Sequence, residues 1–327
     1  MRINVIAWDN GLGLSRHLRL LALALRSCGH EVTLTGLRRG NWRKLGRRIG
    51  LGTRDLWNRV LADRGWARLD VNIMIEHIRP EFLAAARRNV LLPHPEWFLE
   101  SDRALLPRVD AVFAQTRHAV PLFEELGARV RYTGFTSEDR RDAAVPRRRV
   151  FFHLAGRSQN KGTVQLLELW RRHPEWPLLT VVQNPRSATS GAVAANIAHR
   201  IDYLDDAELR RLQNAHWFHL CPSETEGYGH YLVEAMGLGA VVITTDAAPM
   251  NEFIAVDRGL RVACTRSGRQ NLATTHFFDE AAMERAIAQA LALPDAELVR
   301  MGAAARGWFE DNARAFPGRL DAALRDL

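Results

Sequence analysis

Residues 220–246 read Leu-Cys-Pro-Ser-Glu-Thr-Glu-Gly-Tyr-Gly-His-Tyr-Leu-Val-Glu-Ala-Met-Gly-Leu-Gly-Ala-Val-Val-Ile-Thr-Thr-Asp, and this stretch decides how the rest of the chain is interpreted. Its pattern predicts a short apolar strand, a glycine loop, a helix over residues 230–238 and a β-branched strand over residues 240–244. Gly227 and Gly229 free the backbone for a tight turn before the helix. The stretch therefore predicts strand, loop, helix and strand, the repeating pattern of an α/β fold.

Two carboxylates stand out in this stretch. Glu226 lies in the glycine loop, and Glu234 lies about one turn inside the following helix. We expect both to face the amino-terminal end of the helix, where free N–H groups and the helix dipole suit a ligand that carries hydroxyls and phosphates. On residue type alone, the alternative is that Glu226 is a helix-start carboxylate and Glu234 a solvated one, without a ligand.

A second motif, Gly156-Arg157-x3-Lys161-Gly162, follows the predicted strand Val150–Leu154. Its two cations could reach one phosphate site from a loop and from a helix start, arginine as a fork and lysine as a point charge. Fixed cations of this kind stabilise the negative charge that grows on a departing diphosphate. The alternative is a pair of surface cations on a turn.

Together the two motifs resemble the donor-binding signature of retaining glycosyltransferases of the family 4 type, also called glycosyl transferases group 1. The resemblance covers most of residues 150–255 and the amino-terminal half only loosely. It implies the GT-B fold, an α/β fold with two Rossmann-like doubly wound domains that face each other across a cleft. It also implies that Arg157 and Lys161 bind the donor diphosphate. Glu234 would hold the ribose, and Glu226 would lie near the donor sugar.

The resemblance implies a wider set of donor-binding residues, namely Tyr203, Gly227, Tyr228, Gly229, Asn251 and Glu252. Tyr203 lies where the family holds the base. Ala247-Ala-Pro-Met-Asn-Glu-Phe departs from the Gly-Gly-x-x-Glu loop that is common in the family, and the double alanine leaves the donor-sugar preference open.

The chain opens with a predicted βαβ unit, with strands over residues 2–8 and 31–35 and a helix between them. Such a unit has a right-handed crossover and a parallel sheet. Gly11 and Gly13 follow the first strand, as in dinucleotide-binding folds, but Arg16 occupies the third glycine position. An NADP-dependent oxidoreductase therefore stays as a weakened alternative.

The resemblance implies that Gly11, Gly13 and His94 close the cleft from the amino-terminal domain. In many family members a group of that domain stands beside the donor sugar, and His94, between two prolines at a strand end, could fill this catalytic role. A loop histidine without such a role is the other interpretation.

Strands and helices continue to alternate up to a polar stretch, Thr136–Arg149, which has the composition of a linker. We predict an acceptor-side domain over residues 1–140, joined by carboxy-terminal helices over about 307–327, and a nucleotide-sugar-binding domain over 148–306. A short helix is expected over Pro80–Arg88. The tail is expected to form separate helices, over Asp295–Arg306, Trp308–Ala315 and Arg319–Leu327.

The formal charge of +8 predicts an anionic partner or surface. Segment 38–57 concentrates arginines with interleaved tryptophan and aliphatic residues. It is either a solvated loop or a surface that docks on anionic lipid headgroups or on a phosphate backbone.

The sequence predicts a cytoplasmic protein, because its three cysteines are scattered and it contains no apolar run of bilayer length and no signal-peptide pattern. With the basic segment as a docking surface, the protein would be peripheral on the inner face of the membrane. No Asp-x-Asp motif occurs, so we expect no metal and no other cofactor beyond the nucleotide-diphosphate sugar that is the donor substrate.

The prediction is a metal-independent, retaining glycosyltransferase that moves a sugar from a nucleotide-diphosphate sugar to an anionic acceptor. Family frequency favours a membrane glycolipid, a lipopolysaccharide or another cell-surface glycan as the acceptor. A DNA glycosyltransferase acting on a hydroxymethylated base would need the same cationic surface and a flipped-out nucleotide. A nucleotide-sugar-binding module without turnover is the remaining alternative.

Overall fold

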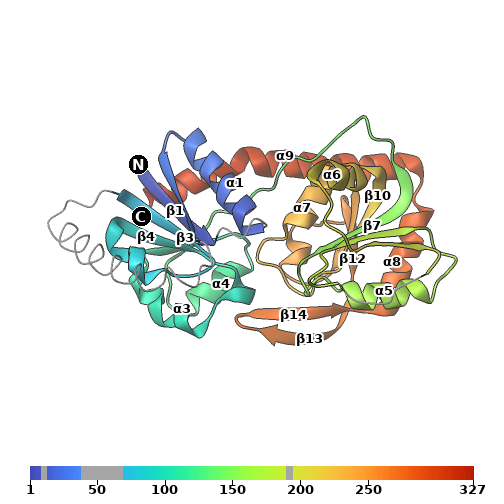
Figure 1. Cartoon of the computed structure of the whole chain (residues 1–327), viewed down its shortest axis with the longest axis horizontal. Coiled ribbons are helices and arrows are strands. Elements are labelled where there is room, and N and C mark those ends of the chain that lie inside the picture. The colour runs from blue at the N-terminus through green and yellow to red at the C-terminus, as the bar shows by residue number, and fades with distance from the viewer. Residues whose placement is uncertain (9–12, 38–68, 189–193) are drawn as a thin grey trace. The chain divides into compact units, whose positions relative to one another are not determined.

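The computed structural model describes residues 1–8, 13–37, 69–188 and 194–327. The chain forms two compact units (Figure 1). Unit 1 comprises Met1–Phe135 and Arg314–Leu327, and unit 2 comprises Thr136–Ala313. Segment 38–57, interpreted above as either a solvated loop or a docking surface, lies outside the described residues.

Unit 1 is built on a six-stranded parallel sheet with strand order β2-β1-β3-β4-β5-β6. Its strands are β1 (Arg2–Trp8), β2 (Glu31–Leu37), β3 (Leu69–Ile75), β4 (Ala86–Leu92), β5 (Ala111–Ala114) and β6 (Val130–Tyr132). Its helices are α1 (Gly13–Ser27), α3 (Glu100–Leu105) and α4 (Ala119–Glu124), with 3₁₀ turns η1 (Pro80–Ala85), η2 (Pro95–Trp97) and η3 (Leu106–Arg108).

The helix predicted over Pro80–Arg88 is wrong in its last three residues. Only η1 is helical, and strand β4 already begins at Ala86. The strand extends because Ala86 and Arg88 pair with Leu69 and Val71 of β3, so tertiary pairing overrides the helical propensity of an alanine-rich run.

Unit 2 contains a second six-stranded parallel sheet, with strand order β12-β11-β10-β7-β8-β9. Its strands are β7 (Arg148–Gly156), β8 (Leu179–Gln183), β9 (Ile197–Arg200), β10 (His216–Cys221), β11 (Val241–Thr245) and β12 (Gly259–Val262). Its helices are α5 (Thr163–Arg171), α6 (Asp206–Ala215), α7 (His230–Gly237), α8 (Glu280–Ala292) and the first part of α9 (Asp295–Arg325), with the 3₁₀ turn η4 (Met250–Glu252).

Helices cover both faces of this second sheet (Figure 1). Phe151 and Phe152 are neighbours in β7 and both are buried, so their side chains point to opposite faces. Phe151 belongs to the core that α5, α8 and the start of α9 build on one face. Phe152 packs against His216 and His219 of β10 on the other face. A sheet that is buried on both sides explains why its strands are continuous apolar runs.

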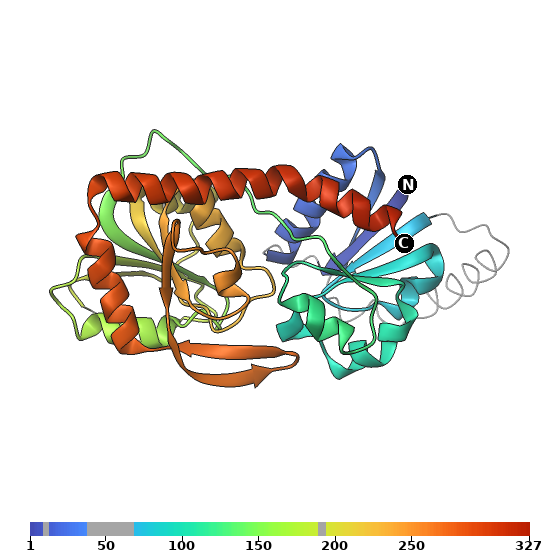
Figure 2. The same cartoon turned by 180° about the vertical axis from the view of Figure 1, so that it is seen from behind.

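Unit 2 also contains an antiparallel hairpin of β13 (Cys264–Gln270) and β14 (Ala273–Phe278), which Figure 2 draws in orange. The sequence did not predict it. Most of β13 is exposed on both faces, so the apolar alternation that identifies a half-buried strand is missing.

The tail forms one long helix, α9, where the sequence predicted three (Figure 2). Pro317 lies inside it, and its missing N–H removes the helical hydrogen bond to the carbonyl of Ala313. Ala313 is also the last residue of unit 2, so the helix loses this bond where the chain passes into unit 1.

Candidate active site

The strand order of unit 2 creates a point at which the chain reverses direction across the sheet. It runs from β7 outward to β8 and β9, then returns to β10 on the other side of β7. In doubly wound sheets ligands bind outside the carboxyl ends of the strands at such a reversal. The loop after β7 carries Arg157 and Lys161, and the loop after β10 carries Glu226. The two sequence motifs therefore meet at the expected ligand-binding edge of this sheet.

Lys161 and Glu226 are in direct contact at this edge, where the Nζ of Lys161 donates to Oε1 of Glu226. Their side chains are 14% and 12% exposed, so the pair is largely withdrawn from water. The same ammonium lies 3.8 Å from the centre of the Tyr231 ring, and Ser223 donates its hydroxyl to Glu226 at 2.5 Å. The lysine is thus held by a carboxylate and by an aromatic face.

The backbones of the two loops are hydrogen-bonded and closely packed beside this pair. Glu224 donates its N–H to the carbonyl of Asn160 at 2.9 Å. Gly162 has a φ of +64°, and a Cβ there would meet the carbonyl oxygen of Pro222 at 2.5 Å. Only glycine fits this approach, and Gly162 caps the start of α5, whose free N–H groups add to the cationic character of the edge.

His153 in β7 contacts the residues on which the same two loops are anchored. Its Nδ1 lies 2.8 Å from the carbonyl oxygen of Leu220, and its Nε2 lies 2.9 Å from the hydroxyl of Thr163. A carbonyl only accepts, so Nδ1 carries the proton and Nε2 accepts from Thr163. Burial lowers the pKa of His153 to about 4, so the ring is neutral at pH 7 and joins β7, β10 and α5 without adding charge.

Glu234 is buried in α7, with 1% exposure. It accepts a hydrogen bond at 3.4 Å from the Nε2 of Gln213 in α6. Gly229, in the left-handed region with a φ of +88°, caps the start of α7, and a Cβ there would lie 3.6 Å from the Cγ of Glu226.

The remaining predicted donor residues are spread around the edge. Arg157 is exposed, and Tyr203 is 82% exposed after β9. Tyr228 is buried, with its ring against Phe253. Asn251 in η4 donates to Asp246 at 2.9 Å, and Glu252 ends the same turn. Lys161, Glu226 and the two loops around them are therefore brought together in the structure, whereas Tyr203 is not in direct contact with them.

In unit 1 the reversal of strand order lies between β1 and β3. Gly13 begins α1 after β1, and Gly11 lies outside the described residues. His94 follows β4, is 8% exposed and stands edge-on to the ring of His17, with centroids 5.1 Å apart.

His94 belongs to a chain of titratable groups that the sequence did not reveal. Its Nδ1 lies 3.6 Å from Oε1 of Glu76, and Oε2 of Glu76 lies 3.7 Å from Nε2 of His77. His77 in turn bonds Asp102 at 2.8 Å. Burial alone would raise the pKa of Glu76, but the interaction with His94 and the nearby positive charges outweigh it, so the pKa lies below its usual value.

The backbone at Glu76 is strained. Glu76 has a φ of +73°, and His77 donates its N–H to the carbonyl of Ile75 at 2.9 Å, which closes a three-residue γ-turn. A glutamate in this region costs about 1–3 kcal/mol, and such strain concentrates at functional sites. The sequence carries no signal for it, because glutamate is not a residue that marks left-handed turns.

The two Rossmann-like units, each with its own strand-order reversal, have the architecture of the GT-B fold. The chain belongs to the glycosyl transferases group 1 family, whose model matches residues 135–308. This range includes both motifs of unit 2. No curated protein matches the chain by sequence.

Solved structures with the same fold extend over the whole chain. A glycosyltransferase from Rickettsia africae has a TM-score of 0.74 at 14% identity, covering 99% of this chain and 98% of that one. HepE from Anabaena, solved with UDP and glucose, has a TM-score of 0.71 at 13% identity and covers both chains completely. Sucrose-phosphate synthase from Thermosynechococcus elongatus has a TM-score of 0.70 at 14% identity, covering 99% and 98%.

Within the described residues, no helix has the length and apolar character needed to cross a membrane.

Proposed function

We propose that this glycosyltransferase retains the anomeric configuration of its donor and holds the donor diphosphate with Arg157 and Lys161. The observation that carries the proposed diphosphate site is the contact between Lys161 and Glu226 at the reversal point of the unit 2 sheet. A lysine buried against a carboxylate and an aromatic ring is already oriented before any ligand arrives, which is the preorganisation that stabilises developing charge.

Donor binding would change the partner of Lys161. A diphosphate at the start of α5 competes with Glu226 for the ammonium group of Lys161, since a diphosphate carries more negative charge than one carboxylate. Glu226, still held by Ser223, is then available to accept hydrogen bonds from hydroxyls of the donor sugar. Arg157, exposed on the same loop, supplies the second cation.

The transfer we propose breaks the bond between the anomeric carbon and the diphosphate oxygen, and forms the new bond on the same face of the sugar. The proton of the acceptor hydroxyl moves to the departing phosphate oxygen, so no side chain has to act as base. Lys161, Arg157 and the N–H groups of α5 stabilise the charge that grows on the diphosphate. We propose that the reaction needs no metal.

UDP-glucose is the first donor to test, because HepE has been solved with UDP and glucose. Glu234 would bind the ribose hydroxyls, Gly227 and Gly229 would allow a close approach of backbone to the donor, and Asn251, Glu252 and Tyr203 would complete the donor site.

On the acceptor side we propose that Glu76 of unit 1 binds the acceptor hydroxyl, that His94 stands beside the donor sugar, and that Gly11 and Gly13 have the closing role that the resemblance implies. The acceptor is proposed to be an anionic membrane glycolipid or lipopolysaccharide, approached by peripheral contact of the basic segment 38–57 with the membrane surface. Stronger salt-sensitive binding to duplex DNA than to anionic liposomes would instead favour a nucleic-acid acceptor.

The test is a panel of nucleotide sugars, with hydrolysis measured without acceptor and product anomers assigned by NMR. Lys161→Ala and Glu226→Ala should each lower turnover about 100-fold or more. Arg172→Ala serves as the control, since it removes an exposed ion pair with Glu280 elsewhere in unit 2. Unchanged turnover in both site variants overturns the diphosphate site, and an inverted product overturns retention.

A further inference from the structure

Gln213 lies between Arg140 and Glu234 and forms a hydrogen bond with each of them. Its Oε1 accepts from the Nε of Arg140 at 2.6 Å, and its Nε2 donates to Oε2 of Glu234 at 3.4 Å. All three side chains are buried, with exposures of 4% or less. The Nε2 of His219 also lies 2.9 Å from the main-chain carbonyl of Gln213, which helps to hold this residue in place.

The chemistry of the partners determines the orientation of this amide. Arginine only donates, and an ionised carboxylate only accepts. The glutamine oxygen must therefore face Arg140 and its NH₂ must face Glu234. Arg140 thus fixes the direction in which Gln213 donates, and Gln213 fixes one oxygen of Glu234.

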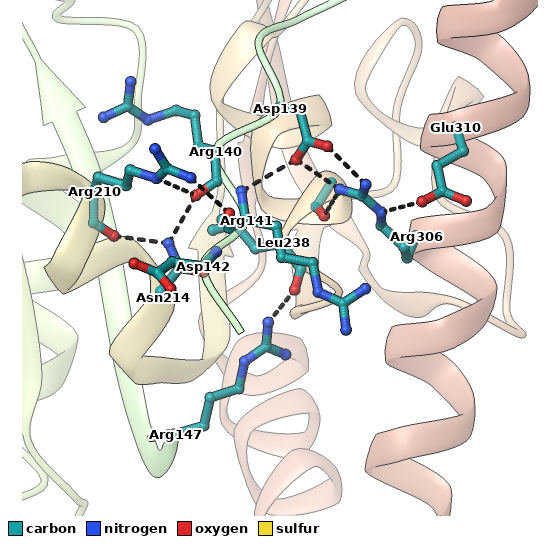
Figure 3. Close-up of polar contacts among 11 residues, drawn as sticks. Asp139, Arg140, Arg141, Asp142, Arg147, Arg210, Asn214, Leu238, Arg306 and Glu310 are labelled. Atoms are coloured by element: carbon teal, nitrogen blue, oxygen red, sulfur yellow. Dashed lines mark hydrogen bonds and ion pairs between the residues drawn. The ribbon is translucent and has the colours of Figure 1, made fainter. Parts of the chain in front are cut away.

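Arg140 is itself anchored by contacts that do not involve Glu234. Its Nη1 lies 2.9 Å from a carboxylate oxygen of Asp206, at the start of α6. Its carbonyl oxygen accepts from Arg210 at 3.0 Å and from Asn214 at 2.8 Å, both on α6, as Figure 3 shows. The arginine therefore has little freedom to follow movements of the glutamine.

Arg140 lies in the connecting segment, residues 136–147, with which unit 2 begins after the chain leaves unit 1. This segment also holds both ends of α7, the helix that carries Glu234. Ser137 bonds His230 at the start of α7 at 2.8 Å. Arg147 donates to the carbonyls of Leu238 and Gly239 just after its end, the latter at 2.7 Å.

We propose that Arg140 and Gln213 are positioning residues for Glu234, so that the connecting segment sets how tightly the enzyme binds the ribose of its donor. The inference rests on the proposed role of Glu234. Arg140 aligns Gln213, and Gln213 holds the carboxylate of Glu234 in the one rotation that accepts the ribose hydroxyls. Neither Arg140 nor Gln213 needs to touch the donor.

The experiment compares binding of UDP and of 2′,3′-dideoxy-UDP by calorimetry, for the whole chain and its variants. The ratio of the two affinities isolates the ribose hydroxyls. Glu234→Gln tests the proposed function itself, and it should bring the ratio close to one. Gln213→Met and Arg140→Met should lower UDP affinity about tenfold, the worth of a hydrogen bond to a charged group, and leave dideoxy-UDP affinity within about twofold.

Two further variants separate positioning from stability. Arg140→Lys keeps the charge and a donor, and should recover part of the ratio. Arg141→Met, a change at the exposed neighbour in the same segment, should leave it unchanged. Melting temperatures identify variants that fail to fold. If Gln213→Met or Arg140→Met does not fold, the affinity ratio is measured on Gln213→Leu or Arg140→Lys instead.

Suppose that Glu234→Gln brings the affinity ratio close to one, as expected. The positioning role is then overturned if Gln213→Met leaves the ratio unchanged or lowers the affinity for both ligands equally. An unchanged ratio in Glu234→Gln overturns the proposed ribose site, and the inference fails with it.

Discussion

Asp139 and Arg306 join the two segments by which the chain passes between its units. Nη1 and Nη2 of Arg306 donate to Oδ1 and Oδ2 of Asp139, both at 2.7 Å (Figure 3). The same guanidinium donates to the carbonyl of Gly237 at 2.7 Å, at the end of α7. The connecting segment, α7 and α9 are thus tied at one arginine inside unit 2.

Replacing Asp139 with asparagine should lower the free energy of unfolding by about 0.5–1 kcal/mol at pH 7, because a forked pair with a half-exposed carboxylate is only partly screened. The hydrogen bonds from Arg306 hold the pKa of Asp139 below its ordinary value of 3.8. The stabilisation is therefore complete above that value and is lost as the pH falls through the lower pKa of the folded protein.

Urea unfolding of the wild type and of Asp139→Asn, at pH 7 and near pH 3, checks this. The difference between the two proteins should shrink at the lower pH. Glu297→Gln, which removes an exposed pair with Arg300 within α9, should leave the urea midpoint unchanged. A difference that grows toward low pH would contradict the assignment.

Alanine at Gly162 should disrupt the site more than alanine at Gly156, although both glycines have a positive φ and stand at the two ends of the same loop. At Gly162 the new Cβ would meet a backbone carbonyl at 2.5 Å, whereas at Gly156 nothing lies within 4 Å. We expect losses of about 2–4 kcal/mol and about 1 kcal/mol, respectively. Denaturant unfolding and UDP titration measure both effects, and equal costs would show that the contact with Pro222 is not tight.

Unit 2 should lose stability steeply below pH 6.5. Burial lowers the pKa of His153 and His216 to about 4 and that of His219 to about 3. The unfolded chain therefore binds more protons between pH 6.5 and 4, and stability falls with pH by about 1.4 kcal/mol per unit for each histidine. Above pH 6.5 this contribution is fully present.

The slope of unfolding free energy against pH, taken between pH 7 and 5, tests the effect. His216→Gln should reduce the slope by about one third, since one of the three buried groups no longer titrates. His173 is the opposite control, because the hydrogen bond that it donates to Glu175 raises its pKa. Its contribution is present below pH 6.5 and is lost as the pH rises through the raised pKa, so His173→Gln should steepen the slope.

Most of the fold could be predicted because local patterns of apolar residues identify its strands and helices. Runs such as Val241–Thr245 are apolar and β-branched, and they became buried parallel strands. The hairpin of β13 and β14 could not be predicted, since most side chains of β13 are exposed to solvent on both faces of the strand. The sequence analysis predicted separate helices in the tail, but α9 continues through Pro317 because Phe316 and Leu320 on either side are fully buried in unit 1.

The candidate site was predictable in part. Lys161 and Glu226 lie in motifs whose loops follow neighbouring strands, so their meeting followed from a doubly wound sheet. Arg140 and Gln213 lie in unremarkable polar contexts far apart in sequence, and only the packing of α6 against the connecting segment reveals their link to Glu234.

Glu76 offers the sharpest test of unit 1. Glu76→Gly removes the carboxylate and relieves a φ of +73°, so the gain from lost strain should offset the lost contacts with His77 and His94, and stability should change by less than about 1 kcal/mol. If the carboxylate binds the acceptor, transfer should still fall at least about tenfold while donor hydrolysis stays constant. Asn271→Gly, at a φ of +52° in an exposed turn of unit 2, should change neither rate. Retained transfer in Glu76→Gly would mean that the strained turn serves the fold of unit 1 and not its chemistry. Loss of transfer with unchanged stability would instead show that the strained backbone is kept because the glutamate is needed for transfer.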